Sequence, residues 1–263
     1  MPTIWIELLG LIAYTVTFVY VWLNRATIDK TSTILIALVF VDIIIHGFIS
    51  YLNIDTPEGH NFGLFNIFNM TTWISMIIFL WNLLKYNSAT LLLFSIPISA
   101  VSILGVILFD GIAPIQLKGN GLNILHILLG ILAMGILLLA AIQSILVLYI
   151  DRKLRVSPAN LSNIFGSLQS IERYLLQLLT SGFIFMTLSL ILVSLLPYEV
   201  TQAQVLHKVI LTLISWFILA ILIFGYYLRG WRGVFAAKWT LIGVFLLMLG
   251  YFGSKLVIEF IIG

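Results

Sequence analysis

Long apolar runs separated by short polar connections dominate the chain. A helix needs about 20 apolar residues to cross the hydrocarbon core of a bilayer. Eight segments reach that length, and we predict them as membrane-spanning helices over residues 4–23, 33–53, 65–84, 90–109, 123–150, 173–195, 207–228 and 239–261. The alternating strands of about ten residues that are typical of a membrane β-barrel do not occur. The pattern therefore predicts an all-α membrane protein, a polytopic bundle of eight transmembrane helices in a single integral membrane domain over residues 1–263.

Composition strengthens this prediction and limits the chemistry. Hydrophobic residues make up 62% of the 263 residues and charged residues only 9%, whereas a soluble domain carries about 25% charged residues. The opening MPTIWIELLG lacks the basic region and small-residue cleavage site of a signal peptide, so we expect segment 4–23 to be retained. Cysteine is absent, which excludes disulfides, zinc–thiolate sites, thiol redox chemistry and covalent haem attachment. Any metal must be held by His, carboxylate or Met.

The distribution of Lys and Arg predicts the orientation. One set of connections and segment ends holds ten of them: Arg25, Lys30, Lys85, Arg152, Lys153, Arg155, Arg173, Arg229, Arg232 and Lys238. The opposite set holds three: Lys118, Lys208 and Lys255. The positive-inside rule places the basic set in the cytoplasm. We therefore expect a multi-pass protein of the bacterial inner membrane, surrounded by lipid, with both termini on the outer (periplasmic) side.

All four histidines then lie on or near the outer side. His126 and His207 stand at the outer ends of two spans, each ahead of a long apolar run. His46 lies in the outer part of span 33–53, and His60 lies in the connection that follows it. We take His126, His207 and His46 as candidate cofactor ligands. His60 is typical of a solvated loop residue, and we expect no role for it.

A stripe of mostly small residues follows His126 along one face of its predicted helix. Its members are Gly130, Ala133, Leu137, Ala140 and Ser144. Small residues line the interfaces between membrane helices, so close helix packing explains the stripe. A second interpretation is that Gly130 and Ala133 leave room for a flat ligand beneath the imidazole. Both interpretations can hold together.

Asp42 and His46 form a second polar feature, one helical turn apart in span 33–53. A carboxylate in mid-span is costly, so it should face the bundle interior or a wet cavity and have a partner. We expect His46 to be that partner. The pair is either a structural contact between helices or a functional one, since a carboxylate behind an imidazole orients a metal-ligating histidine. A transporter that uses Asp42 and His46 is a further alternative.

Two imidazoles at the same depth, in a chain without cysteine, suit haem or a transition metal that is bound non-covalently. Neutral histidine is a preferred ligand of haem iron and of several divalent metals. We therefore expect His126 and His207 to ligate the iron of a non-covalent haem b. No hydrolase motif and no phosphate-binding glycine loop occurs in the sequence. We expect a non-catalytic protein that has no nucleic-acid partner.

The C-terminal part of the sequence resembles a known family. The runs HILLGILAMGILLLAAIQSILVLYIDRKLR, LQSIERYLLQLLTSGFIF and RGWRGVFAAKW, within residues 120–263, are similar to the cytochrome c assembly family of CcsA, CcmC and HemX type, in particular its YpjD-like branch of inner-membrane proteins. The resemblance implies haem handling on the outer face, with histidines as axial ligands. It matches His126 to the outer-face histidine that opens the corresponding helix.

Two features of the larger family are missing from this sequence. PYEVTQAQVLHK stands where the family has a tryptophan-rich haem-binding loop, and LVIEFIIG stands where a second outer-face histidine would follow the last span. His207 is therefore proposed from its position alone. The sequence predicts a haem-binding or haem-handling protein related to cytochrome c biogenesis, with other membrane or cytochrome-assembly proteins as possible partners. The alternative is a haem-free structural or regulatory subunit that assists another membrane protein.

Overall fold

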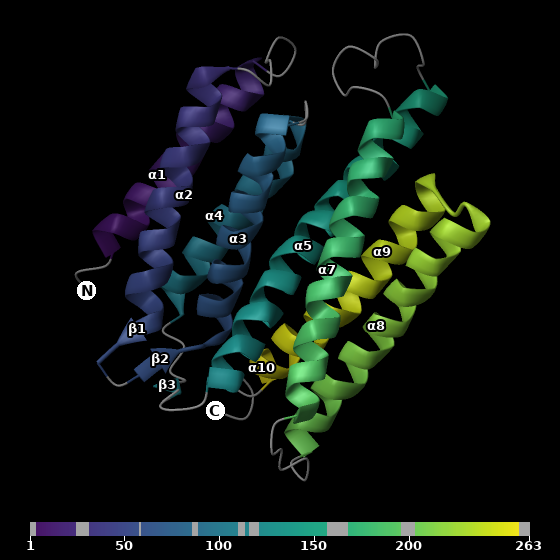
Figure 1. Cartoon of the computed structure of the whole chain (residues 1–263). Helices are drawn as coiled ribbons and strands as arrows, with labels where there is room; N and C mark the ends of the chain where they lie inside the picture. Colours follow the sequence, from purple (N-terminus) through teal and green to yellow (C-terminus); the bar gives the residue numbers. More distant parts are fainter. Residues whose placement is uncertain are drawn as a thin grey trace. The chain divides into compact units, whose positions relative to one another are not determined.

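The chain is nearly all helical (Figure 1). The computed structural model describes residues 4–24, 32–57, 59–85, 89–109, 114–115, 121–156, 168–195 and 203–257. The chain divides into two compact units. Of the described residues, those within 4–115 form unit 1, and those within 121–156 and 168–257 form unit 2. The prediction of one integral domain over residues 1–263 stays a prediction.

Unit 1 contains four helices and a small sheet. Its elements are α1 (Ile4–Asn24), α2 (Thr33–Ile54), β1 (Asp55–Thr56), β2 (Gly59–Asn61), α3 (Leu64–Lys85), the 3₁₀ turn η1 (Ala89–Leu91), α4 (Leu92–Leu108) and β3 (Pro114–Ile115). Helix α1 packs on α2 and α4, and α3 packs on α2 and α4, so the four helices enclose one interior.

Unit 2 contains the longest helices. Its elements are α5 (Gly121–Val156), α7 (Leu168–Leu195), α8 (Ala203–Arg229), α9 (Gly233–Met248), the π-helical segment η3 (Leu249–Gly253) and α10 (Ser254–Val257). Helix α5 packs mainly on α7 and α9, and α8 packs mainly on α9 and α7. The core between them is formed by Ala133, Met134, Leu137, Leu179, Met186, Leu219, Leu222, Ile223, Val244 and Leu247.

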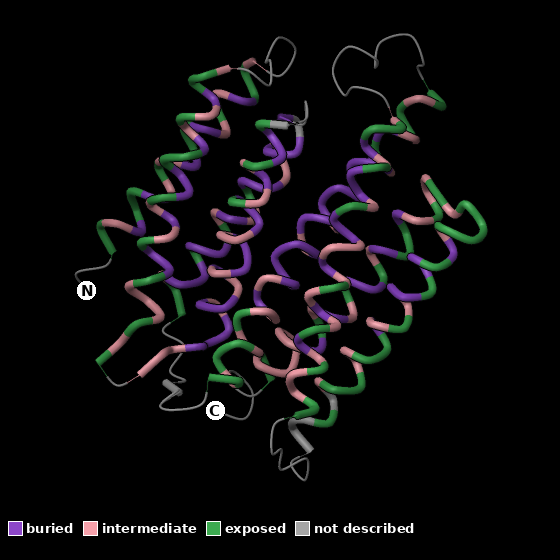
Figure 2. Tube along the Cα trace, viewed as in Figure 1, coloured by how far each residue is buried: buried purple, intermediate pink, exposed green. Residues whose placement is uncertain are grey.

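The prediction of an all-α fold is confirmed, and each of the eight predicted spans falls on a helix. Within the described ranges, seven helical segments are long and apolar enough to cross a membrane. The eighth, α4, has 17 residues and is shorter than the usual span, although η1 directly precedes it. Figure 2 shows exposed residues alternating with buried ones along the helices. Many of the exposed residues are large and apolar, such as Trp5, Trp81 and Leu228, which fits a membrane environment.

The turn between α8 and α9 explains the RGWRG sequence. Gly230 and Gly233 have φ angles of +69° and +61°, a left-handed conformation that favours glycine. The backbone N–H of Trp231 donates to the carbonyl of Gly225 at 3.3 Å. The Trp231 ring lies directly on Gly225, where an added Cβ would come within 2.1 Å of it. The motif is therefore a tight turn that folds an indole back onto the end of α8.

The connections that follow α2 and α4 in unit 1 contain strands that the sequence pattern did not predict. β1, β2 and β3 form an antiparallel sheet in that order. Asp55 pairs with His60, and His60 pairs with Ile115. The sheet therefore joins the α2–α3 connection to the chain that leaves α4.

Candidate functional site

His126 lies near the start of α5, half-buried, and contacts α7. Its Nδ1 is 2.9 Å from the backbone carbonyl oxygen of Ser189 and 3.0 Å from the Ser189 hydroxyl. A carbonyl oxygen only accepts hydrogen bonds, so Nδ1 carries the hydrogen and donates it. The Ser189 hydroxyl lies 3.2 Å from the His126 carbonyl, to which it donates in turn. These contacts hold the imidazole against α7.

This arrangement determines the tautomer of the neutral ring. With the hydrogen on Nδ1, the lone pair is on Nε2, which has no hydrogen-bond partner among the residues that the structure describes. A hydrogen bond from one ring nitrogen to a backbone carbonyl is the usual way in which a metal-ligating histidine is oriented. The contacts of Nδ1 with α7 therefore hold the His126 ring and leave the lone pair of Nε2 unused within the described residues.

His207 is the fifth residue of α8, but its side chain is outside the described residues. The predicted convergence of His126 and His207 on one iron therefore stays a prediction. His126 belongs to α5 and His207 to α8, and both helices pack mainly on α7 and α9. Among the described residues, no three His, Asp or Glu side chains are grouped as ligands of a metal ion.

The stripe below His126 faces the packed interior of unit 2. A Cβ added at Gly130 would lie 3.4 Å from the Ser189 hydroxyl, and Gly182 of α7 lies against Leu137. Ala133 belongs to the buried core. Close packing between helices accounts for these contacts. Room for a planar ligand beside Gly130 and Ala133 stays a prediction.

Two lysines meet one aromatic ring at the same end of unit 2. The ammonium groups of Lys208 in α8 and Lys255 in α10 lie 5.8 and 5.9 Å from the ring centroid of Tyr251. His207 directly precedes Lys208. Helices α5 and α8 both start at this end of unit 2, where α10 also lies, as Figure 1 shows. The end of unit 2 that carries His126 therefore also carries a positive charge.

His46 lies in the interior of unit 1, and its partners differ from the prediction. Its Nδ1 is 2.7 Å from the hydroxyl of Tyr14, and its Nε2 is 2.6 Å from Oδ1 of Asn69. The expected pairing of His46 with Asp42 is wrong, because two neutral partners from α1 and α3 occupy both ring nitrogens. His46 therefore offers no open nitrogen to a cofactor in this structure.

Further polar groups continue this network across the unit. Asn69 donates to Ser50 at 3.1 Å, and Ser102 of α4 donates to the Asn69 side-chain oxygen at 3.1 Å. The hydroxyl of Thr72 lies 2.7 Å from that of Ser102. The sequence predicted the polar face of α2, but the polar residues of α3 and α4 that complete the network were not predicted. The available signal was the three- to four-residue spacing of Asn66, Asn69 and Thr72, and of Ser95, Ser99 and Ser102.

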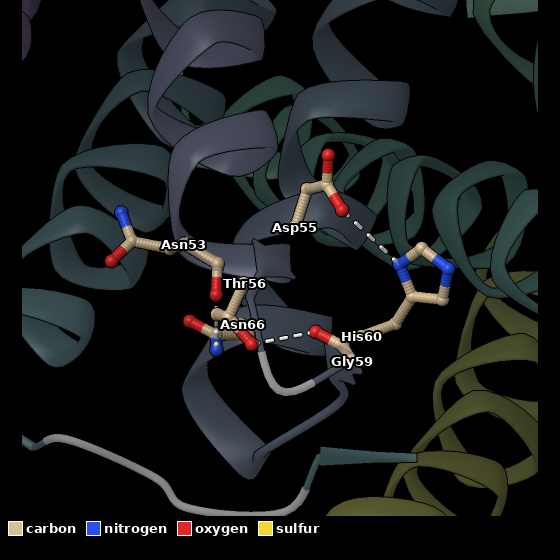
Figure 3. A network of polar contacts seen from close by, with 6 residues as sticks. All are labelled: Asn53, Asp55, Thr56, Gly59, His60 and Asn66. Carbon is tan, nitrogen blue, oxygen red and sulfur yellow. Dashed lines mark hydrogen bonds and ion pairs between the residues drawn. The ribbon is translucent and has the colours of Figure 1, made fainter. Parts of the chain in front are cut away.

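A second group of polar contacts lies beside the small sheet, and Figure 3 shows part of it. Asn53 donates to Glu7 of α1 at 3.0 Å, and Asn66 donates to the backbone carbonyl of Asn53 at 3.2 Å. His60 forms an ion pair with Asp55 at 3.7 Å, and both side chains are more than 40% exposed. The predicted loop position of His60 is thus part of a strand, and its ion pair is a surface contact of little energetic weight.

Comparison with known families gives a match along nearly the whole chain. Residues 3–262 match the family model described as "Cytochrome C assembly protein". The likeness therefore extends beyond residues 120–263 to the first four helices as well. No solved structure matches the chain.

Related proteins occur in Escherichia coli. The inner membrane protein YpjD of strain K12, and the YpjD proteins of strains O6:H1 and O157:H7, are each 28% identical to this chain over 138 residues. That match covers 52% of this chain and 52% of each relative. The similarity thus spans about half the length of these proteins.

Proposed function

The chain belongs to the cytochrome c assembly protein family, and from this premise we propose that it binds haem non-covalently and handles it on the outer face of the membrane. It is a multi-pass protein of the bacterial inner membrane, as the related YpjD proteins are by name. In the proposed topology the eight predicted spans all cross, with both termini outside. This topology rests on the ten-to-three distribution of Lys and Arg.

The observation that carries the proposal is the fixed tautomer of His126. Neutral imidazole ligates haem iron through one ring nitrogen while the other donates a hydrogen bond. The His126 contact with the Ser189 carbonyl provides that second interaction at 2.9 Å. Haem would bring an iron that accepts axial nitrogen ligands and two negatively charged propionates. Since the chain has no cysteine, attachment through thioether bonds is excluded.

The cationic end of unit 2 supports the same location. Haem propionates are carboxylates, and lysine ammonium groups are suitable partners for them. Lys208 and Lys255 flank Tyr251 there, so they can bind the propionates while the apolar macrocycle contacts apolar side chains. His207, in the same turn as Lys208, is the proposed second axial ligand. His46 is not included, because both of its nitrogens are hydrogen-bonded inside unit 1.

The proposed role is non-catalytic. The protein would hold haem b for transfer or for storage, in company with other membrane or cytochrome-assembly proteins. Haem-free assistance to another membrane protein is the competing function, and it predicts the same fold with no haem spectrum. A haem titration therefore separates the two functions.

The experiment is a haem titration of the full-length protein in detergent, followed by the Soret absorption. We expect saturable binding that His126→Ala weakens by tenfold or more, which corresponds to about 1.4 kcal/mol or more. His60→Ala is the matched control, because His60 is an outer-side histidine outside the site. His126→Gly should regain haem binding when imidazole is added to the buffer.

Three results would contradict the proposal. The first is a wild-type protein without a saturable Soret band. The second is a His126→Ala variant that binds haem as tightly as the wild type does. The third is equal weakening by His126→Ala and His60→Ala, which would mean unspecific uptake into the micelle. A melting temperature equal to that of the wild type shows that each variant is folded when its haem binding is compared.

A further inference from the structure

Asp42 is a carboxylate in the interior of unit 1 without a basic partner. Asp42 is only 2% exposed and lies near the middle of α2. The sequences of α1, α2, α3 and α4 contain a single Lys or Arg, namely Lys85, which is the last residue of α3. Ionised carboxylates inside a membrane pair with a cationic group or mark an ion or proton pathway. The question is what neutralises Asp42.

The hydroxyl groups of Thr17 and Ser95 lie at the same depth in the bundle as Asp42, as the positions of their neighbours on each helix show. Tyr14 of α1 contacts His46 of α2 and lies within reach of Ser99 of α4. One helical turn further towards the inner end come Thr17, Asp42 and Ser95, three to four residues from Tyr14, His46 and Ser99 respectively. Thr17 lies beside the Asp42 carboxylate. We call Thr17, Asp42 and Ser95 the Asp42 level.

Each residue of the Asp42 level has a buried oxygen that forms no hydrogen bond of ordinary length in the described part of the chain, although the Thr17 hydroxyl lies close enough to interact with the Asp42 carboxylate. These atoms are Oγ1 of Thr17, Oδ2 of Asp42 and Oγ of Ser95. Thr17 is fully buried and Ser95 is 3% exposed. A buried polar atom without a partner costs about 1–3 kcal/mol, and a charged one costs more. Three such atoms at one depth leave room for a partner that oxygen atoms can hold, and the Asp42 carboxylate among them favours a partner with a positive charge.

We propose that the Asp42 level binds a monovalent cation, a proton or a sodium ion, inside unit 1. A single carboxylate balances one positive charge, whereas divalent sites usually combine several carboxylates or waters. The donors are all oxygen atoms, which suit a hard cation or a proton. The titratable groups that face Asp42 are Tyr14 from α1 and His46 from α2, and these are hydrogen-bonded to each other. The neighbouring groups of α3 and α4 are neutral: Asn69, Thr72, Ser99 and Ser102.

Polar side chains are stacked above Asp42 towards the outer end of unit 1. From the Tyr14–His46 contact the network continues through Asn69 to Ser50. The next polar group on α2 is Asn53, which contacts Glu7. Inside an otherwise apolar bundle, this column is the place where a cation would meet the smallest desolvation penalty. The site lies in unit 1 and does not depend on haem binding in unit 2.

The test uses the wild-type full-length protein in detergent and dicyclohexylcarbodiimide, which modifies protonated carboxyl groups in apolar surroundings. Mass spectrometry of the peptide that contains Asp42 measures the labelled fraction over a pH series. Parallel series contain Na⁺ or K⁺ at equal ionic strength. Asp55, an exposed carboxylate in the outer sheet, is the internal control, and Asp42→Asn should lose the label.

The two cations give different results. Labelling that falls as the pH rises and ignores Na⁺ identifies a proton site. Labelling that Na⁺ lowers at fixed pH, but K⁺ does not, identifies a sodium site, and Na⁺ should then raise the melting temperature of the wild type but not of Asp42→Asn. The proposal is overturned if Asp42 is never labelled and Na⁺ leaves the melting temperature unchanged. It is also overturned if labelling is independent of both pH and Na⁺, since Asp42 would then be a permanently protonated structural acid.

Discussion

The hydroxyl of Tyr14 donates a hydrogen bond to Nδ1 of His46 across 2.7 Å, which joins α1 to α2 inside unit 1. The two rings meet edge to face, with their centroids 5.6 Å apart. Both residues are buried, so neither polar atom can turn to water instead. The Asn69 oxygen accepts from Nε2, which leaves Nδ1 as the acceptor for Tyr14. The N-terminal helix is therefore an integral part of the bundle.

Tyr14→Phe should destabilise the protein by about 1–3 kcal/mol, because it leaves Nδ1 of His46 buried without a donor. Thermal unfolding in detergent measures the change in melting temperature. Tyr20→Phe is the matched control on the same helix, since the Tyr20 hydroxyl makes a longer, half-buried contact of 3.2 Å with Ser32. Equal melting temperatures for Tyr14→Phe and the wild type would contradict the prediction.

Gly225→Ala should destabilise the α8–α9 turn. The added methyl group would come within 2.1 Å of the Trp231 ring, and overpacking of this kind costs about 1–3 kcal/mol. Gly121→Ala is the control, because open space surrounds Gly121. In the double variant Gly225→Ala/Trp231→Ala the two effects should not add, since removal of the indole also removes the clash. Additive losses of stability would show that the ring is not the cause.

The proposed topology predicts opposite accessibility for two engineered cysteines. The natural sequence contains no cysteine, so a single substitution gives labelling without background. Asp55→Cys should react with a membrane-impermeant maleimide in intact cells whose outer membrane has been permeabilised. Lys153→Cys, at the exposed end of α5, should react only after the inner membrane is disrupted. Labelling of Lys153→Cys in intact cells would reverse the orientation.

Lys208→Gln and Lys255→Gln should each weaken haem binding by about three- to tenfold, roughly 0.7–1.4 kcal/mol, because each removes a charge that can pair with a propionate. The measurement is the same Soret titration. Haem dimethyl ester, which has no free propionate, should bind the wild type and both variants equally. Lys153→Gln, at the opposite end of α5, controls for the loss of positive charge in general. A variant that weakens the ester as much as haem would place the lysine in a structural role.

The helices were predictable because each depends on a local property of the chain. A run of about 20 apolar residues predicts a span from length alone, and α1 and α2 end within one residue of their predicted bounds. At α5 the apolar run predicted an end at residue 150, whereas the helix continues through Asp151 and Arg155, which form an i,i+4 ion pair at 2.9 Å. Polar residues in a helical register extend a helix without any apolar signal.

The side-chain partners were less predictable because they depend on which helices meet. The i,i+4 spacing correctly placed Asp42 and His46 on one buried face of α2, but spacing within one helix cannot show that Tyr14 and Asn69 reach the imidazole first. The contact of His126 with Ser189 likewise joins two helices 63 residues apart in sequence. The three short strands also escaped prediction, because strands of two or three residues give no periodic signal.

The pairing of β2 with β3 has a consequence for the order in which the chain enters the membrane. His60 precedes α3 and Ile115 follows α4, yet the two residues are paired in the sheet. In the proposed topology the chain passes inward through α3 and returns outward through α4 before Ile115 can reach His60. The sheet can therefore close only after both helices have been inserted.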